Sequence, residues 1–99
     1  MVTIVTEIGL KDGAGTQWDA LMHQRMAAAK DHPGWIGGQL LKPTGDPGRR
    51  VIVGTWQTRD DWSAWHAAPD FQETRAKLDA LVRGPEAHVW HDVVMSLSP

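Results

Sequence analysis

The chain has 99 residues, a formal net charge of −2 at pH 7 and no cysteine. This length fits one domain, and the lack of cysteine excludes disulfides, thiolate metal sites and a cysteine nucleophile. The slightly acidic balance argues against a nucleic-acid-binding protein, which usually presents a basic face.

The first third of the chain predicts a strand followed by a helix. Residues 2–10 direct alternate side chains to opposite faces and are rich in β-branched residues, which is typical of a strand. Thr16 and Asp19 resemble a capping box at the start of a helix. Apolar residues then recur at helical spacing and form one stripe that would lie against a sheet: Trp18, Leu21, Met22, Met26 and Ala29. The helix should end by residue 32, because Pro33-Gly34 cannot continue it.

The rest of the chain predicts three more strands and a divided helical region. Residues 35–42 and 50–57 predict strands that are joined by a turn rich in proline and glycine. Thr58 caps a short helix, Pro69 interrupts it, and a second helix follows. Residues 87–97 predict the last strand. The order β-α-β-β-α-β indicates an α+β ferredoxin-like plait, in which four antiparallel strands carry the helices on one face.

The sheet of this plait is predicted to be apolar on both faces. Val51–Val53 and Val93–Met95 place apolar side chains on both sides of their strands. A sheet that is apolar on both faces is buried on both faces, and the helices are available for only one. A second copy of the chain is the simplest cover for the other face, so we expect a homodimer.

Tryptophan is unusually frequent, with six residues against one phenylalanine and no tyrosine. A chain this small cannot bury all six in a deep core, so some should line a pocket or an interface. Trp18 fits the core, Trp62 fits a surface cover, and the strand residues Trp35 and Trp90 fit an interface.

The N-terminus and the hydropathy pattern predict a cytoplasmic protein. Residues 1–7 have neither the basic segment nor the apolar run of an export signal. No stretch approaches the ~20 apolar residues of a membrane span. The absence of cysteine fits a reducing compartment. We therefore expect one domain over residues 1–99, without membrane or nucleic-acid partners.

Residues 51–71 carry a pattern that resembles a known family. They form an apolar strand that ends at Trp56, a capped turn, and then Trp65-His66 before a small-residue loop and Pro69. His32–Trp35 adds a Pro-Gly-aromatic start to the second strand. The whole pattern is similar to that of the antibiotic biosynthesis monooxygenase (ABM) family of dimeric α/β barrels. The resemblance implies a ligand site within each subunit, between the helices and the sheet.

The resemblance leaves several functions open, because members of this family differ in activity. Some oxidise polyaromatic phenols with molecular oxygen and no bound cofactor, others bind and degrade haem, and many have no assigned reaction. For a haem-degrading member, the resemblance implies an asparagine, a tryptophan and an iron-ligating histidine at positions that are here Thr6, Trp65 and Thr74. Threonine is a poor axial ligand beside imidazole. We therefore expect no cofactor and disfavour haem.

The candidate substrate-binding residues surround one predicted aromatic pocket. Trp65 is the leading pocket residue, with ordinary core as the alternative. Trp56 fits a pocket wall and a dimer core equally. Arg25 could contact an anionic ligand, with a surface salt bridge as the simpler alternative. The remaining predicted lining residues are apolar: Met22, Met26 and Phe71.

Two of the five histidines are candidate catalytic bases, because an unperturbed imidazole titrates near pH 6.5. His23 flanks the apolar stripe of the first helix, and His66 follows Trp65; a solvated position is the alternative for each. His88 and His91 lie on one strand, face opposite sides and cannot chelate together. No pair shows reliable metal-ligand spacing, so we expect no metal site.

The leading interpretation is a cofactor-independent monooxygenase that oxidises an aromatic or polyketide-type substrate with molecular oxygen. A non-catalytic ligand-binding or stress-response protein with the same fold is the main alternative, and a haem-binding protein is the third. The expected partners are a second copy of the chain and an aromatic small molecule.

Overall fold

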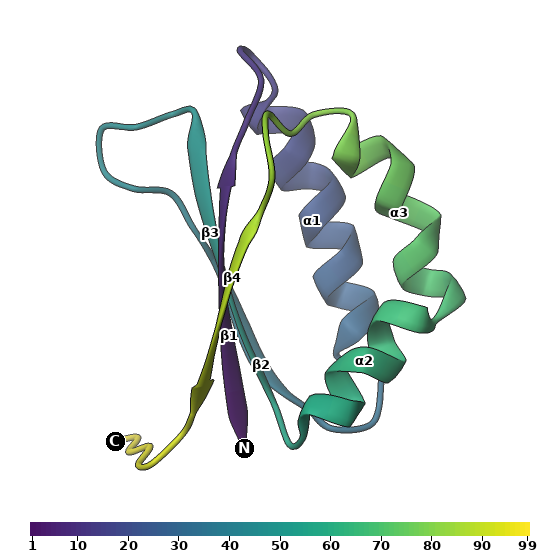
Figure 1. Ribbon diagram of the computed structural model, residues 1–99, viewed down its shortest axis with the longest axis vertical. Helices are drawn as coiled ribbons and strands as arrows, with labels where there is room; N and C mark the ends of the chain where they lie inside the picture. The colour runs from purple at the N-terminus through teal and green to yellow at the C-terminus, as the bar shows by residue number, and fades with distance from the viewer.

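The computed structural model describes residues 1–99 and shows two layers (Figure 1). The elements are β1 (Val2–Gly9), α1 (Gly15–Ala29), β2 (Trp35–Leu41), β3 (Arg49–Trp56), α2 (Arg59–Ala67), α3 (Pro69–Asp79) and β4 (Ala87–Asp92). The strands form one antiparallel sheet in the order β2-β3-β1-β4, and the helices cover one face of it. The predicted α+β ferredoxin-like plait is therefore confirmed. None of the helices is long and apolar enough to cross a bilayer.

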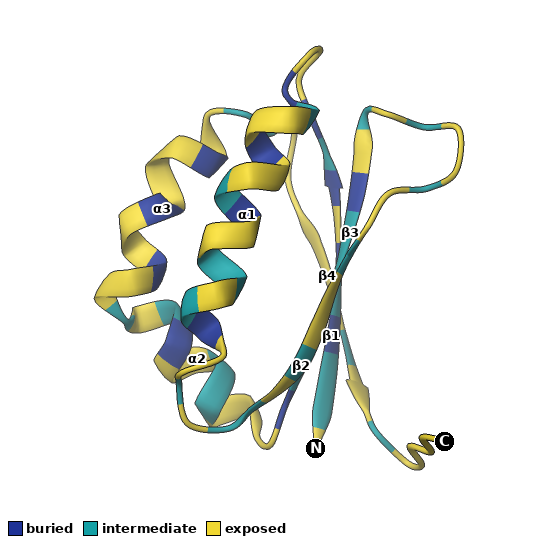
Figure 2. Ribbon diagram, turned by 180° about the vertical axis from the view of Figure 1, so that it is seen from behind, coloured by how far each residue is buried: buried dark blue, intermediate teal, exposed yellow.

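The core lies between the helices and the sheet and consists of two clusters. One contains Ile8, Leu10, Ala14, Trp18, Met22 and Leu78, and the other contains Ile4, Ala29, Trp56, Trp65 and Phe71. Buried positions recur along α1 and α3 and are separated by exposed turns (Figure 2). This recurrence is the apolar stripe that the helical spacing predicts.

The start of α1 differs from the prediction. The helix begins at Gly15 after Ala14, which makes no side-chain capping hydrogen bond, so Thr16 lies within the first turn. Asp19 does not complete a capping box. Its carboxylate instead accepts hydrogen bonds from Nε and Nη2 of Arg50, at 2.8 and 3.1 Å. Arg50 is only 7% exposed, and a buried guanidinium is costly without a charged partner. The Asp19 carboxylate therefore pairs with Arg50 and does not cap the helix.

The start of α2 agrees with the prediction. The backbone N–H of Asp61 donates to Oγ1 of Thr58 at 3.1 Å, and the hydroxyl of Thr58 donates to the Asp61 carboxylate at 2.9 Å. Pro69 then separates the two helices as the first residue of α3. At this position a backbone N–H would have no partner within the helix, so proline costs no hydrogen bond.

The position of α2 depends on a close contact with the turn before β2. Gly34 has a φ of 85°, and a Cβ at this position would overlap the side chain of Asp61. Gln57, the residue after β3, donates its backbone N–H to the carbonyl of Gly34 at 2.8 Å. Glycine at this turn therefore lets α2, with its aromatic residues, pack close to the sheet.

The last strand is shorter than predicted. Asp92 pairs with Val2, the first residue of β1, and one further backbone hydrogen bond joins Val93 to Met1 at 3.0 Å. Beyond it the chain forms no regular structure, and its apolar side chains are exposed: Val94, Met95 and Leu97. The prediction of a two-faced strand over Val93–Met95 is wrong, because β1 offers no partner past its own first residue.

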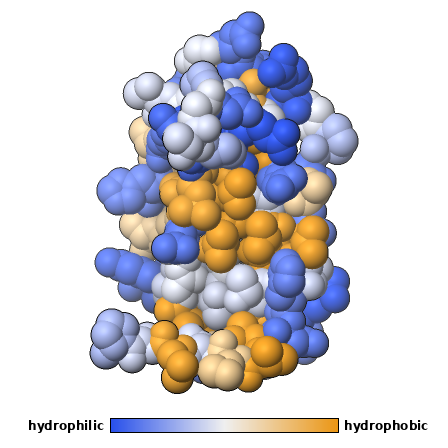
Figure 3. Space-filling model, turned by 90° about the vertical axis from the view of Figure 1, so that its left-hand side faces the viewer, coloured by the Kyte–Doolittle hydropathy of each residue, from blue (hydrophilic) through white to orange (hydrophobic).

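The sheet face that points away from the helices nevertheless has an apolar centre. We call it the outer face; its central row crosses the four strands as Gln39, Val53, Val5 and Val89, and the next row includes Leu41, Val51 and Glu7. Figure 3 shows the resulting hydrophobic band. Val89 and Leu41 are 53% and 42% exposed, and no element of this chain lies over them. The two-faced character predicted for Val51–Val53 is confirmed, since Ile52 packs against the helix side.

We expect Gly34→Ala to destabilise the protein more than Gly45→Ala does. The φ angles are 85° and 83°, but a Cβ at Gly45 has no neighbour within 4 Å. A positive φ costs about 1–2 kcal/mol in either variant. Overlap with Asp61 adds roughly 1–3 kcal/mol at Gly34 alone. Urea unfolding of both variants measures the difference. Equal losses would show that α2 does not pack this closely on the turn.

Candidate functional site

A cavity of about 110 Å³ lies between the helices and the sheet. Hydrophobic side chains supply 13 of its 20 lining residues, so it favours an apolar ligand that carries few polar groups. One water molecule needs at least about 10–15 Å³ of such space, so the cavity accepts on the order of ten non-hydrogen atoms. That size corresponds to one or two fused aromatic rings.

Most of the predicted site residues line this cavity. They are Met22, Arg25, Met26, Trp56, Trp65, His66 and Phe71. Trp56 is 2% exposed and lies in the cavity wall, so it does not contribute to the outer face. His23 is absent from the wall, because it lies on the exposed side of α1. We therefore give His23 no role at the site.

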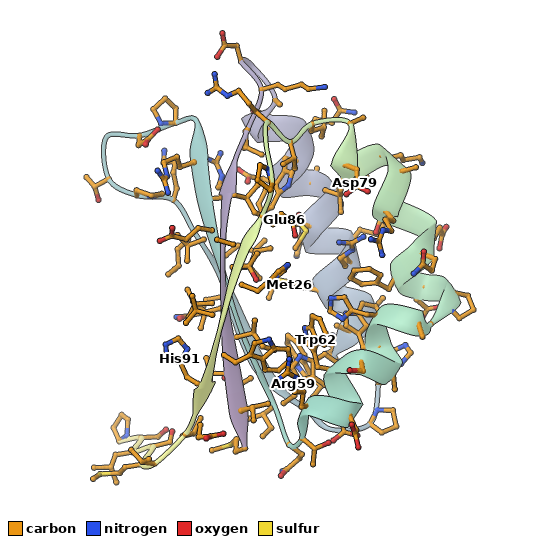
Figure 4. The ribbon with its side chains drawn as sticks, viewed as in Figure 1. Met26, Arg59, Trp62, Asp79, Glu86 and His91 are labelled. Atoms are coloured by element: carbon orange, nitrogen blue, oxygen red, sulfur yellow. The ribbon has the colours of Figure 1, made fainter.

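The positions of three tryptophans differ from the prediction. Trp35 and Trp62 line the cavity, and Figure 4 shows Trp62 between α2 and the sheet, contrary to its prediction as surface cover. Trp35 packs edge-on against Trp56, with ring centroids 5.3 Å apart. Trp90 packs edge-on against Trp62 at 4.8 Å. Trp35 and Trp90 therefore do not contribute to an interface on the outer side of the sheet. For Trp35, the strand register shifts between Trp35 and Gly37, so simple alternation does not predict which face the side chain occupies.

His66 presents a neutral imidazole with one free nitrogen. Its ring packs against Trp62 and Phe71, with centroids 3.7 and 4.1 Å away. Burial lowers the pKa of His66 from 6.5 to about 4, although the hydrogen bond to the backbone acts in the opposite direction. That bond joins Nδ1 to the carbonyl oxygen of Trp62 at 2.9 Å, so Nδ1 carries the proton and Nε2 remains an acceptor. His66 can accept a hydrogen bond from a ligand hydroxyl but is a weak base.

Arg25 is a half-buried cation without an ion-pair partner. Its Nε donates to Oγ1 of Thr74 at 2.9 Å, and Nη2 donates to the carbonyl of Phe71 at 3.1 Å. Its Cζ lies 3.8 Å from the centre of the Phe71 ring. Burial lowers the pKa of Arg25 to about 10, so the side chain stays charged at neutral pH. No carboxylate forms a salt bridge with it, contrary to the surface alternative, and its other N–H groups are available to a ligand.

A row of polar side chains enters the cavity from the sheet. Thr6 of β1 and His88 of β4 are paired residues, and Oγ1 of Thr6 lies 2.9 Å from Nδ1 of His88. Nε2 of His88 lies 3.4 Å from Oε2 of Glu86. All three residues line the cavity, and Figure 4 shows Glu86 beside β4. One local signal pointed to Thr6, because it shares the inward face of the strand with Ile4 and Ile8. Its partner His88, however, lies 82 residues away.

His91 lies on the other side of β4, away from the helices (Figure 4). The prediction that His88 and His91 face opposite sides is therefore confirmed. No group of three or more histidine, aspartate or glutamate side chains lies close enough to hold a metal ion.

The fold and the cavity define a class of small two-layer proteins that can enclose a flat apolar ligand between their helices and one face of a sheet. Within this class, the chain belongs to the antibiotic biosynthesis monooxygenase family, whose model matches residues 1–77. The resemblance noted in the sequence is thus confirmed.

Relatives of known structure or activity agree in fold and differ in function. The mycobilin-producing heme oxygenase of Mycobacterium tuberculosis is 29% identical over 68 residues, which cover 69% of this chain and only 65% of that protein. A protein from Nitrosomonas europaea matches with a TM-score of 0.89 at 17% identity, over 96% of this chain and 100% of its own. SnoaB, a cofactor-independent oxygenase from Streptomyces nogalater, matches with a TM-score of 0.85 at 21% identity, over 99% and 97%. At these identities, the two solved structures show the fold alone.

The haem-degrading pattern that the resemblance implies is incomplete at this site. Thr74 stands where the resemblance implies an iron ligand, and its hydroxyl is 2.9 Å from Nε of Arg25 and 3.3 Å from the carbonyl oxygen of Phe71. Nε2 of His66 is an imidazole nitrogen of the cavity wall that has no protein partner. The chain therefore lacks the iron ligand that the resemblance implies, and the imidazole of His66 reaches the cavity from another position.

We expect the protein to lose stability as the pH falls from about 6.5 toward 4. The pKa of His66 is about 4 in the folded chain, against 6.5 for an ordinary histidine, so in this range the unfolded chain binds more protons. Allowing for its partial exposure, His66 accounts for about 1–2 kcal/mol of the loss. Urea unfolding at neutral and at acidic pH should show a smaller loss for His66→Gln. The exposed control His23→Gln should behave as the wild type. An unchanged pH dependence in His66→Gln would contradict the burial of a neutral imidazole.

Proposed function

We propose that the protein is a cofactor-independent monooxygenase that oxidises a small hydroxylated aromatic compound with molecular oxygen. The observation that carries this proposal is a cavity that combines an aromatic wall with the unpaired guanidinium of Arg25. Membership of the ABM family supports it, as does the structural likeness to SnoaB. The cavity size favours a substrate with one or two fused rings, such as a fragment of polyketide type.

The reaction requires little chemistry from the protein. The substrate loses a proton, and its anion transfers electrons to oxygen as a carbon–oxygen bond forms. The resulting peroxide anion takes up a proton, and the hydroperoxide then loses water as the remaining hydrogen leaves the same carbon, which gives a carbonyl group. One oxygen atom of O₂ therefore enters the product and the other leaves as water. The substrate itself is oxidised, so no resident redox group is required.

The cavity residues would support this reaction in three ways. The rings of Trp56, Trp65 and Phe71 hold a flat substrate away from water. Nε2 of His66 accepts a hydrogen bond from a substrate hydroxyl and orients it. Arg25 stabilises the negative charge that develops on the substrate oxygen, because a cation in a poorly solvated site interacts strongly with an anion.

Arg25→Met should lower kcat/KM for oxygen consumption about 10²–10³-fold, the usual effect of removing one oxyanion-stabilising donor. Naphthalene-type hydroquinones and anthrones are suitable substrates for an oxygen electrode. Arg59→Met is a matched control, since the Arg59 guanidinium also lies over a ring, 4.1 Å from that of Trp90, but Arg59 does not line the cavity. Equal losses in both variants would contradict the role of Arg25.

Ligand binding without turnover is the alternative function. The low pKa of His66 favours it, because the imidazole that packs against Trp62 and Phe71 is a poor base for substrate ionisation. Saturable quenching of tryptophan fluorescence by aromatic ligands, with no oxygen consumption from any of them, would support this alternative. A haem titration that gives a Soret shift, lost in His66→Gln, would instead support the haem binding that the heme oxygenase relative suggests.

We also propose that two copies pair through the outer face. Its valines and Leu41 form a continuous apolar band without cover from this chain, and such patches usually mark an interface. A cytoplasmic location remains a prediction from composition.

Val53→Lys should weaken the dimer roughly 30-fold or more, because it places an unpaired charge in the centre of the band. Gln24→Lys, on the exposed side of α1, adds the same charge away from the band and should leave association unchanged. Sedimentation at micromolar concentration measures both. A monomeric wild type would contradict the dimer.

A further inference from the structure

We propose that Thr6, His88 and Glu86 form a proton-accepting site that ionises a phenolic hydroxyl bound in the cavity. This inference rests on the proposed function, for which it supplies the base. It assigns the catalytic base to the sheet side of the cavity, whereas the sequence pointed to histidines on the helices.

The three side chains form a row from the buried cavity toward solvent. Thr6 is 6% exposed, and its hydroxyl lies 2.9 Å from Nδ1 of His88. The side chains of His88 and Glu86 are 41% and 37% exposed. In neutral His88, the N–H on Nε2 faces the Glu86 carboxylate, which leaves Nδ1 to accept the hydrogen bond from Thr6. The hydroxyl oxygen of Thr6 can then accept a hydrogen bond from a substrate.

The proton transfer balances without any further reagent. The substrate O–H bond breaks as its proton moves to Oγ1 of Thr6, and the original Thr6 proton moves to Nδ1 of His88. Threonine is regenerated, the substrate becomes a phenolate, and His88 becomes an imidazolium that faces Glu86. The proton then leaves through the exposed edge of the imidazole or the carboxylate.

A carboxylate faces His88 on the side of the imidazole away from Thr6. Oε2 of Glu86 lies 3.4 Å from Nε2 of His88, and the other charged residues that line the cavity are Arg25 and Asp79. The nearest ring of α2 is that of Trp62, whose centroid is 6.5 Å from that of His88. His66 has no carboxylate partner, and its Nδ1 already donates to a backbone carbonyl. Arg25 would instead stabilise the phenolate.

The test uses 4-nitrophenol, whose phenolate absorbs at longer wavelength than the phenol and whose ten non-hydrogen atoms match the cavity. In neutral buffer, where an ordinary imidazole is mostly uncharged, the free compound is only partly ionised. The wild type should bind it largely as the phenolate. Thr6→Val, which is nearly isosteric, and His88→Gln should each lower the ratio of bound phenolate to bound phenol roughly tenfold, the worth of one charge-assisted hydrogen bond. Glu86→Gln should lower it less.

Two controls separate the proton relay from a change in the pocket. Thr6→Ser keeps the hydroxyl and should keep the phenolate. Nitrobenzene lacks the hydroxyl, so its affinity, measured by tryptophan quenching, should be the same in every variant. A wild type that binds nitrobenzene but leaves bound 4-nitrophenol protonated would overturn the proposal.

Phenolate formation that survives His88→Gln would also overturn it, because Thr6 would then act only as a hydrogen-bond donor. Failure of the proposed function has a different signature. If 4-nitrophenol ionises in a Thr6-dependent way but no hydroquinone or anthrone consumes oxygen, the relay stands and the monooxygenase proposal falls.

Discussion

The register of β1 is the constraint on which the rest of this structure depends. β1 lies inside the sheet and pairs with both β3 and β4, so each of its residues fixes a position on two neighbours. Alternation sends Ile4, Thr6 and Ile8 toward the helices and Val5 toward the outer face. A shift of one residue would exchange the two sets. It would remove Thr6 from the cavity and place a glutamate in the core.

Burial in the cavity leaves its two half-buried basic groups in different charge states. Desolvation lowers the pKa of both His66 and Arg25. Histidine starts near neutrality and so becomes a neutral acceptor, whereas arginine starts so high that it keeps its charge. An apolar pocket thereby acquires one hydrogen-bond acceptor and one cation that forms no direct salt bridge. A hydroxylated ligand that becomes anionic complements both, and this complementarity connects the electrostatics to the proposed reaction.

Local sequence patterns predicted a helix cap correctly only where the capping residues had no charged partner elsewhere in the chain. The cap at Thr58 formed as its spacing implies, since Thr58 and Asp61 are both near solvent and find each other within one turn. Asp19 has the same spacing from Thr16 but binds the buried Arg50. A buried guanidinium without a partner would cost several kcal/mol, more than one exposed cap contributes. The shorter β4 has a similar origin, because strand length depends on a neighbour that the strand's own sequence does not describe.

The sequence by itself determined the order of elements, the plait, the family and most of the cavity wall, because period, turn chemistry and a compact motif are local properties. Trp65, Phe71 and Arg25 were predictable from helical spacing and resemblance. The tertiary structure alone decided that Trp35 and Trp62 line the cavity, that His23 lies outside it, and that Thr6 meets His88. Those outcomes depend on strand register, on a local irregularity and on how closely α2 packs on its turn. Contacts between residues far apart in the chain set these features, and no local pattern encodes them.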